Sequence, residues 1–293
     1  MLICIFSYNR GRYLDNLLRS VRQFYPDVDY RIWDDGSTDP ATLQLLQQQE
    51  PNVFFAAPAE GAEKHGGLYA HMSAALDYAA AQGYRYASFV QDDMQLVWRN
   101  PALLQQLEQL FESDRVVMVN SNFLARIAFY MAEQTVLPSH AMAHVHRDFG
   151  VADTGIIDVA KAQRIGLSFD HGSERKHGEW WKARGFDLMV LHQPELCWVP
   201  WPEVYRNRVK QTGVGRTRSY NRLLVKPLTA SAIGRLQRNG HIAYLEMFTA
   251  AANPFMIKPY WYQEFVSARA MVSVYCKYYW HRLARLLVKP RMA

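Results

Sequence analysis

Short apolar runs alternate with stretches of helical periodicity through the first two thirds of the chain. Residues 2–6 predict a buried strand, residues 12–24 carry apolar side chains at helical spacing, and the same order then repeats. Strands that alternate with helices build a parallel sheet with helices on its faces, because each crossover returns the chain to the same end. The sequence therefore predicts an α/β protein with a doubly wound, mainly parallel sheet.

The remaining elements follow from the same reasoning. The predicted strands are 2–6, 30–33, 53–56, 84–90, 116–120 and 196–199, and the predicted helices are 12–24, 42–49, 68–81, 101–111 and 158–165, with a last helix–strand unit over 180–190. A less regular, His-rich stretch covers 128–153, and a basic, glycine-dotted loop is expected over 205–222.

Two acidic clusters each end one of these strands. The first is residues 34–39, with Asp34, Asp35 and Asp39, and the second holds Asp92 and Asp93. Carboxylates crowded at strand ends repel one another unless a cation or polar ligand collects them, and ligands of open α/β sheets bind at that edge. Their hard oxygens suit Mg²⁺ or Mn²⁺, with diphosphate and water completing the coordination. The structural alternatives are a turn with a helix cap for the first cluster and a solvated loop for the second.

Cysteine usage and hydropathy limit the other classes of protein. Cys4, Cys197 and Cys276 are far apart and form no CxxC pair, which argues against a disulfide framework or a zinc ribbon and favours a reducing, cytoplasmic compartment. We expect no signal peptide, and no apolar run of about eighteen residues predicts a membrane-spanning helix.

Charge is distributed unevenly along the chain. The net charge is +6, but residues 205–293 carry 16 Lys and Arg against 2 Asp and Glu. From residue 258 onward apolar and aromatic side chains recur in steps of three and four among further cations. This pattern favours a helix on an anionic membrane surface, and the alternative is a helix packed on its own domain or on a second subunit. A nucleic-acid partner is disfavoured, because the body of the chain is acidic and carries none of the usual binding modules.

Taken together, the motifs resemble the family 2 glycosyltransferases of the GT-A fold, a Rossmann-like arrangement. The resemblance covers roughly residues 1–205. It rests on Ser7-Tyr8-Asn9 after the first strand, Asp34-Asp35-Gly36-Ser37-Thr38-Asp39 after the second, the Gly67…Ala70…Ala74 helix, Gln91-Asp92-Asp93 at the metal motif, and Arg164-Ile-Gly166-Leu-Ser-Phe169-Asp170 before the catalytic carboxylate.

The resemblance implies a role for each matching residue of the donor site. Ser7 and Tyr8 would contact the nucleotide, with Tyr8 stacking on the base, and Asp35 would accept a base N–H. Asp92 would lie near the ribose, and Asp93 would bind Mg²⁺ or Mn²⁺. Lys64 is a candidate contact of the diphosphate, and an exposed lysine is the alternative.

The resemblance also implies a position for the catalytic base, which is found by its spacing from Gly185. Family members place a Glu-Asp pair about eleven residues before the glycine that ends a helix, and Gly185 puts Ser173 and Glu174 at that pair. Glu174 is therefore the expected base, although Ser173 departs from the pattern. Glu179 is the alternative, Asp170 is a third candidate, and Glu174 as a simple helix cap is the structural alternative.

These expectations define one function and two rivals. The chain is expected to be an inverting, metal-dependent glycosyltransferase with a UDP- or dTDP-sugar donor and a saccharide acceptor, which the basic tail suggests is lipid-linked and part of surface polysaccharide synthesis. It would comprise a catalytic domain (1–225) and a basic helical region (226–293) on the cytoplasmic membrane face. One alternative is a sugar-phosphate nucleotidyltransferase, which would have a glycine-rich loop after the first strand, and residues 7–12 do not form such a loop. The other alternative is a non-catalytic sugar-nucleotide or membrane-binding protein.

Overall fold

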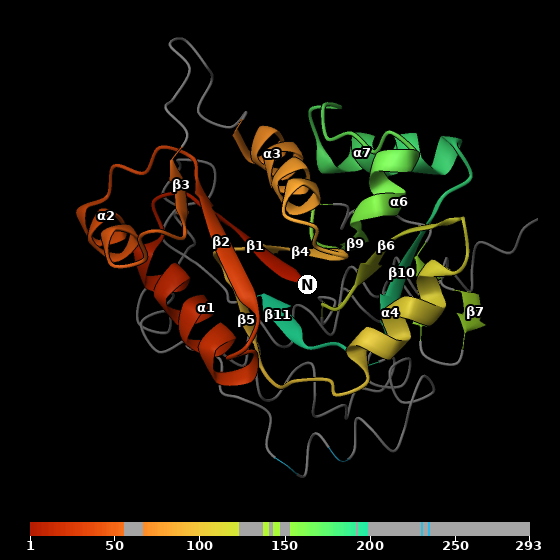
Figure 1. The fold of residues 1–293 in the computed structure, drawn as a ribbon, viewed down its shortest axis with the longest axis horizontal. Helices are drawn as coiled ribbons and strands as arrows, with labels where there is room; N and C mark the ends of the chain where they lie inside the picture. Colours follow the sequence, from red (N-terminus) through yellow and green to blue (C-terminus); the bar gives the residue numbers. More distant parts are fainter. Residues whose placement is uncertain are drawn as a thin grey trace, which may run out of the picture.

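The computed structural model describes residues 1–55, 67–122, 137–140, 143–146, 153–191 and 193–198, together with the single positions 230 and 234. Figure 1 shows these elements as ribbons. The helices and strands are β1 (Leu2–Ser7), α1 (Gly11–Phe24), β2 (Asp29–Asp34), α2 (Pro40–Gln47), β3 (Val53–Phe55), α3 (Gly67–Ala81), β4 (Tyr86–Gln91), β5 (Met94–Leu96), α4 (Leu103–Phe111), β6 (Val116–Asn120), β7 (Leu137–His140), β8 (Ala143–His146), β9 (Gly155–Asp158), α6 (Val159–Arg164), α7 (Glu174–Ala183), β10 (Asp187–Leu191) and β11 (Leu196–Trp198).

One large sheet organises the described residues. Its strands lie in the order β3-β2-β1-β4-β9-β6-β10-β8-β7, and β11 pairs with β5 beside it. Strand β1 is parallel to both β2 and β4, β2 is parallel to β3, and β6 is parallel to β10. Strand β9 runs antiparallel between β4 and β6. The predicted α/β class with a mixed, mainly parallel sheet is thus confirmed.

Each face of the sheet is covered by helices, because side chains of β1 alternate between two apolar cores. Leu2, Cys4 and Phe6 pack in one core with residues of α3, α6 and α7. Ile3 and Ile5 pack in the other with residues of α1 and α4. Figure 1 shows α3, α6 and α7 together on one face and α1 and α4 on the opposite face. Both faces of β1 are therefore buried in apolar cores, and polar side chains lie at the ends of the central strands.

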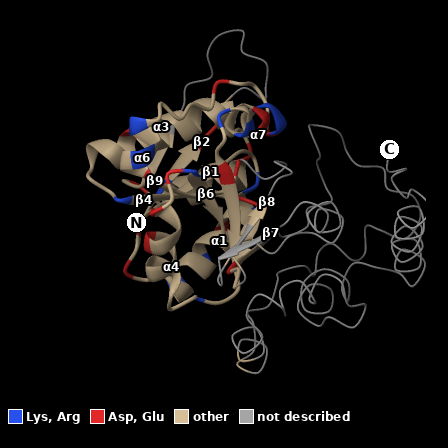
Figure 2. Cartoon of the chain, turned by 90° about the vertical axis from the view of Figure 1, so that its right-hand side faces the viewer, with Lys and Arg blue, Asp and Glu red and all other residues tan. Residues whose placement is uncertain are grey.

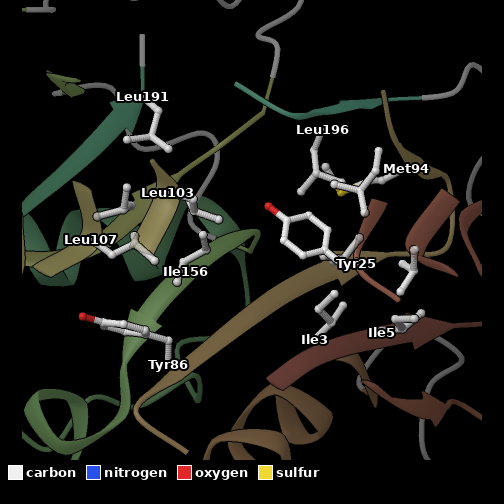
Figure 3. Close-up of a cluster of buried hydrophobic side chains, with 14 of the residues drawn as sticks. Ile3, Ile5, Tyr25, Tyr86, Met94, Leu103, Leu107, Ile156, Leu191 and Leu196 are labelled. Atoms are coloured by element: carbon white, nitrogen blue, oxygen red, sulfur yellow. The ribbon is translucent and has the colours of Figure 1, made fainter. Parts of the chain in front are cut away.

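The core beneath α1 and α4 contains one buried carboxyl. Figure 3 shows the ring of Tyr25 lying among aliphatic side chains of β1, β5 and β11. The Tyr25 hydroxyl donates to Glu195 Oε1 at 2.5 Å, and the backbone N–H of Asn100 donates to the same oxygen. Glu195 is 2% exposed, and burial raises its pKa to about 7. This carboxyl therefore joins the segment before β11 to the end of α1 and holds its proton to a higher pH than an exposed glutamate does.

Several element boundaries differ from the predicted ones. Helix α7 begins at Glu174 rather than at 180, because Ser173 Oγ accepts from the N–H of Lys176 and starts the helix in a segment with few apolar residues. Strand β9 interrupts the parallel order, and its four residues are too short a pattern to be assigned from sequence. Strands β7 and β8 form a hairpin within the stretch predicted to be irregular.

The second predicted domain, 226–293, and the basic loop 205–222 lie outside the described residues, apart from two single positions. Both expectations therefore stay predictions. Within the part of the chain that the structure describes, no helix has the length and apolarity needed to cross a membrane. Figure 2 shows acidic and basic residues interspersed over this part, with both signs on α7.

Candidate active site

Three neighbouring strand ends bring the two acidic clusters together. In the parallel ladder Ser7 of β1 lies opposite Asp34 of β2, and Phe6 lies opposite Gln91 of β4. The cluster after β2 and the cluster after β4 therefore flank the end of β1 at the carboxyl edge of the sheet. This is the edge at which open α/β sheets bind ligands.

Two carboxylates of the first cluster are used by their own backbone. Asp34 is completely buried and accepts from the N–H and Oγ of Ser37, at 2.7 and 2.6 Å, which closes the turn. Burial raises the pKa of Asp34, and the two bonds from Ser37 oppose that rise. Asp39 caps α2 by accepting from the N–H and Oγ1 of Thr42, at 2.8 and 2.6 Å. For these two residues the turn-and-cap alternative is correct.

The third carboxylate of this cluster, Asp35, faces α3 instead. Its backbone N–H donates to Ser7 O at 2.9 Å, and its Oδ1 lies 3.5 Å from Nε2 of His71, a buried residue of α3. A Cβ at Gly67 would lie only 1.6 Å from Asp35 Oδ1, so the position requires glycine. Asp35 is thus the carboxylate of the first cluster that a ligand can use, and His71 is a neighbour that the sequence did not indicate.

Asn9 ties the first two loops of the site together. Its Oδ1 accepts from the N–H groups of Thr38 and Asp39, at 2.6 and 2.8 Å, and its own N–H donates to Ser37 Oγ at 2.8 Å. The backbone of Asn9 has φ of 52°, a left-handed conformation that asparagine tolerates better than most residues. Asn9 does not cap α1, because the residue before this helix is Arg10, which has no side-chain cap bond.

The second cluster is buried and neutralised by an arginine. Asp92 and Asp93 are 3% and 2% exposed, so the solvated-loop alternative is wrong. The N–H of Tyr8 donates to Asp92 Oδ2 at 3.0 Å. Arg10 Nη1 lies 3.0 Å from Asp92 Oδ1 and 3.0 Å from Asp93 Oδ2. Burial raises the pKa of Asp92, and the guanidinium opposes that rise.

The chemistry of this donor set fits a divalent cation under one condition. Mg²⁺ and Mn²⁺ commonly take one or two carboxylates and complete their shell with water and phosphate oxygens, and Asp93 supplies an oxygen of this kind. No group of three or more His, Cys, Asp or Glu within the described residues could hold a metal ion by itself. Asp93 therefore fits as a ligand of Mg²⁺ or Mn²⁺ if Arg10 moves away and a diphosphate supplies further oxygens.

A second pair of carboxyl groups begins next to the first. Gln91, at the end of β4, donates from Nε2 to Asp153 Oδ2 at 2.7 Å. Asp153 shares a further hydrogen bond with the side chain of Glu174, the first residue of α7. A bond between two carboxyl groups requires a proton on one of them. Burial raises the pKa of Asp153, in keeping with a shared proton.

The candidates for the catalytic base differ in their surroundings. Ser173 caps α7, so the alternative that Glu174 is merely the cap is wrong. Glu179 is 58% exposed and pairs with Arg175 at 2.8 Å on the same helix, and Asp170 is 77% exposed beside His171. Through Asp153 and Gln91, Glu174 alone of the three is joined to the acidic edge by contacts described here.

The other predicted site residues have simple positions. Ser7 is 4% exposed, and its Oγ has no hydrogen-bond partner within the described part of the chain. Tyr8 is half-buried at the same edge. Lys64 lies outside the described residues, so its contact with a diphosphate stays a prediction.

Besides His71, three residues of the site were not among the predicted site residues. Arg10 and Asn9 were visible within a quoted motif, but nothing in the sequence indicates which loop each would contact. Asp153 follows a His-rich stretch without recognisable motif, and its partner lies 21 residues further along the chain. Only the strand order brings these groups together.

Comparison with known proteins finds matches to glycosyltransferases. Residues 2–129 match the model of glycosyl transferase family 2. A curated relative, the uncharacterized glycosyltransferase alr2836 of Nostoc sp. strain PCC 7120, is 33% identical over 124 residues, which are 40% of this chain. Residues 2–129 are therefore similar to the family 2 glycosyltransferases. The chain spans only 34% of the length of that relative.

Solved structures of low sequence identity are also similar. S. aureus TarS 1-349 in complex with UDP has 16% identity and a TM-score of 0.47, over 69% of this chain and 61% of that one. The same protein in complex with UDP-GlcNAc has 14% identity and a TM-score of 0.47, over 85% of this chain and 71% of that one.

Proposed function

We propose that the protein transfers a sugar from a nucleotide-diphosphate sugar to a hydroxyl group of a saccharide, with inversion at the sugar carbon. One observation carries the proposal: within the stretch similar to family 2 glycosyltransferases, the strand register sets Asp35 on one side of Ser7 and the Asp92–Asp93 pair on the other. A base reader and a diphosphate site at adjacent strand ends are what a nucleotide-sugar donor needs.

The donor is a UDP- or dTDP-sugar in this proposal. Uracil and thymine each present a ring N–H, which the Asp35 carboxylate accepts, while Tyr8 stacks on the base. Asp92 lies near the ribose. Lys64 remains a proposed contact of the diphosphate. When bound, Mg²⁺ or Mn²⁺ held by Asp93 offsets negative charge on the diphosphate that leaves.

Glu174 acts as the general base. The acceptor oxygen forms a bond to the sugar carbon on the face opposite the diphosphate, the bond from that carbon to the diphosphate oxygen breaks, and the acceptor proton passes to Glu174. The link from Glu174 through Asp153 and Gln91 to the strand edge supports this role, because it holds the carboxyl group beside the donor site.

The acceptor and the location are proposed from the basic C-terminal region. A lipid-linked saccharide of a surface polysaccharide, met at the cytoplasmic membrane face, would explain the cations and aromatic residues of 258–293. Flotation with anionic vesicles tests this part: deletion of 258–293 should release the protein. Unchanged flotation would contradict the membrane role and leave the donor chemistry untouched.

A nucleotide panel tests the central proposal. The melting temperature should rise with UDP or dTDP in the presence of Mn²⁺ and much less with GDP, since a ligand that binds only the folded state stabilises it. Asp35→Ala should abolish the rise, whereas Asp15→Ala, on the exposed side of α1, should keep it. Release of UDP or dTDP from a cognate sugar nucleotide should follow. Pyrophosphate release from a nucleoside triphosphate and a sugar phosphate would instead identify the nucleotidyltransferase rival.

A further inference from the structure

Arg10 holds both carboxylates of the second acidic cluster. It follows β1 directly, and its Nη1 bonds Asp92 Oδ1 and Asp93 Oδ2 at 3.0 Å each. The side chain of Arg10 is 29% exposed, whereas those of Asp92 and Asp93 are 4% and 3% exposed. The cation thus lies on the solvent side of the pair and covers it.

Burial makes this cation necessary in the ligand-free protein. Two adjacent carboxylates removed from water repel each other and lose hydration, so they ionise together only beside a positive charge. A guanidinium remains charged at all ordinary pH values and can contact two oxygens at once. Arg10 therefore offsets part of the negative charge of the pair before any ligand arrives.

The same contact competes with a metal ion. A divalent cation bound to Asp93 Oδ2 would lie within a few ångströms of Arg10 Nη1, and like charges at that distance repel strongly inside a protein. The partly exposed guanidinium therefore needs a different anionic partner when a metal binds. A diphosphate at this edge offers one, since planar guanidinium groups bind phosphate oxygens through paired hydrogen bonds.

We propose that Arg10 is a movable cation that leaves Asp92 and Asp93 for the diphosphate of the donor and thereby releases Asp93 to a divalent cation. The assignment rests on the proposed donor site and adds to it an order of events. Metal alone binds weakly because Arg10 occupies its ligand. Diphosphate and metal strengthen each other's binding in part through Arg10, beyond their direct contact with each other.

Two ligands that need no sugar chemistry test the proposal by calorimetry. Arg10→Gln should bind Mn²⁺ alone about tenfold more tightly than the wild type, because the competing charge is gone. It should bind pyrophosphate, measured with EDTA present, about tenfold more weakly, because a phosphate contact is lost. Arg19→Gln, which removes an exposed charge from the same helix, should change neither affinity.

Either of two results overturns the proposal. If Arg10→Gln binds Mn²⁺ alone no better than the wild type, Arg10 does not compete with metal. If the wild type does not bind pyrophosphate, Arg10 does not bind a diphosphate. The same conclusion follows if Arg10→Gln binds pyrophosphate as tightly as the wild type does. Loss of sugar transfer with both binding results intact would count against the proposed function alone.

A conservative variant covers the risk that Arg10→Gln does not fold. Arg10→Lys keeps the charge beside the carboxylates but loses the planar fork. Its affinity for Mn²⁺ alone should therefore stay near the wild-type value while pyrophosphate binding weakens. A large gain in Mn²⁺ affinity for Arg10→Lys would contradict competition by charge.

Discussion

Two pairs of carboxyl groups lie near each other in this protein and are neutralised in different ways. At the end of β4, Asp92 and Asp93 share the guanidinium of Arg10. At the start of α7, the side chains of Glu174 and Asp153 interact, and a hydrogen bond between them requires a proton on one of the two carboxyl groups. Gln91 lies between the two pairs, adjacent to Asp92 in the chain and bonded to Asp153.

The difference matters for chemistry. A pair held by a guanidinium, which stays charged at all ordinary pH values, can exchange that cation for a ligand. A pair that shares a proton changes its charge with pH and is suited to proton transfer. In the proposed function, the first pair therefore serves donor binding and the second pair serves the chemical step.

The largest expected effect comes from the second pair. Glu174→Gln should lower kcat by roughly 10³-fold, because a positioned general base typically contributes 10²- to 10⁴-fold. Binding of UDP or dTDP should stay within about twofold of the wild type, since the altered group takes part in proton transfer rather than donor binding. Steady-state kinetics and calorimetry on the same preparation measure both quantities.

Glu179→Gln is the matched control for this experiment. Glu179 lies on the same helix but pairs with Arg175 and is 58% exposed, so its loss should leave kcat within about twofold. A large loss of kcat in Glu179→Gln, with Glu174→Gln active, would assign the base to Glu179 and remove the contrast between the two pairs.

The division between the pairs also explains what the sequence could predict. The sheet class and the placement of both acidic clusters at strand ends follow from periodicity, because a strand and the loop after it are local features. The contact of Asp92 and Asp93 with Arg10 does not follow from periodicity, because Arg10 is 82 residues away from Asp92 in the sequence. Local rules for turns and helix caps describe the bonds of Asp34 and Asp39 correctly. They do not predict that Asp35 lies beside His71 of α3, because that contact depends on how the helix packs.

The second pair was harder to predict for the same physical reason. Glu174 was identified by its distance from Gly185 along the chain, but Asp153 has no such marker. It lies two residues before β9, a short strand that runs antiparallel within a mainly parallel sheet. Only the tertiary order of β4, β9 and α7 shows that the two carboxyl groups meet.

Glu195 is another buried carboxyl group and lies away from the site. It tests whether a carboxyl group that holds a proton in the folded state makes the stability depend on pH. Its pKa is about 7 in the folded protein against an ordinary value of 4.5, so the folded state keeps a proton that the unfolded chain has lost between these values. Stability from this group is therefore complete below about pH 4.5 and declines as the pH rises to about 7, by about 3 kcal/mol.

Glu195→Gln should remove this decline and keep the bonds from Tyr25 and Asn100, since an amide oxygen accepts as a carboxyl oxygen does. Urea unfolding at several pH values measures the difference between variant and wild type. Glu112→Gln, at an exposed position after α4, is the control and should follow the wild type. A parallel decline in Glu195→Gln would show that another group is responsible.

Replacing Asp153 should have a smaller effect on the reaction and move its pH dependence. Asp153→Asn should lower kcat about tenfold, or about 1.4 kcal/mol, because Glu174 loses the partner that orients it. The acid-side limb of the kcat profile should shift to lower pH, since Asn cannot place a negative charge beside Glu174. A uniform loss of kcat with an unmoved limb would contradict proton sharing and leave only a packing role.

The smallest expected effect separates the carboxylates within the first cluster. Asp39→Ala removes the cap of α2, where both bonds from Thr42 end, and should lower the free energy of unfolding by about 1 kcal/mol without weakening UDP or dTDP binding. Asp35→Ala should do the reverse, because Asp35 lies beside His71 of α3 rather than at a helix end and is the proposed contact of the base. Urea unfolding and calorimetry on the two variants give a two-by-two comparison. Weakened nucleotide binding in Asp39→Ala would mean that the α2 cap shapes the base pocket, so that structure and recognition are not divided between neighbouring carboxylates.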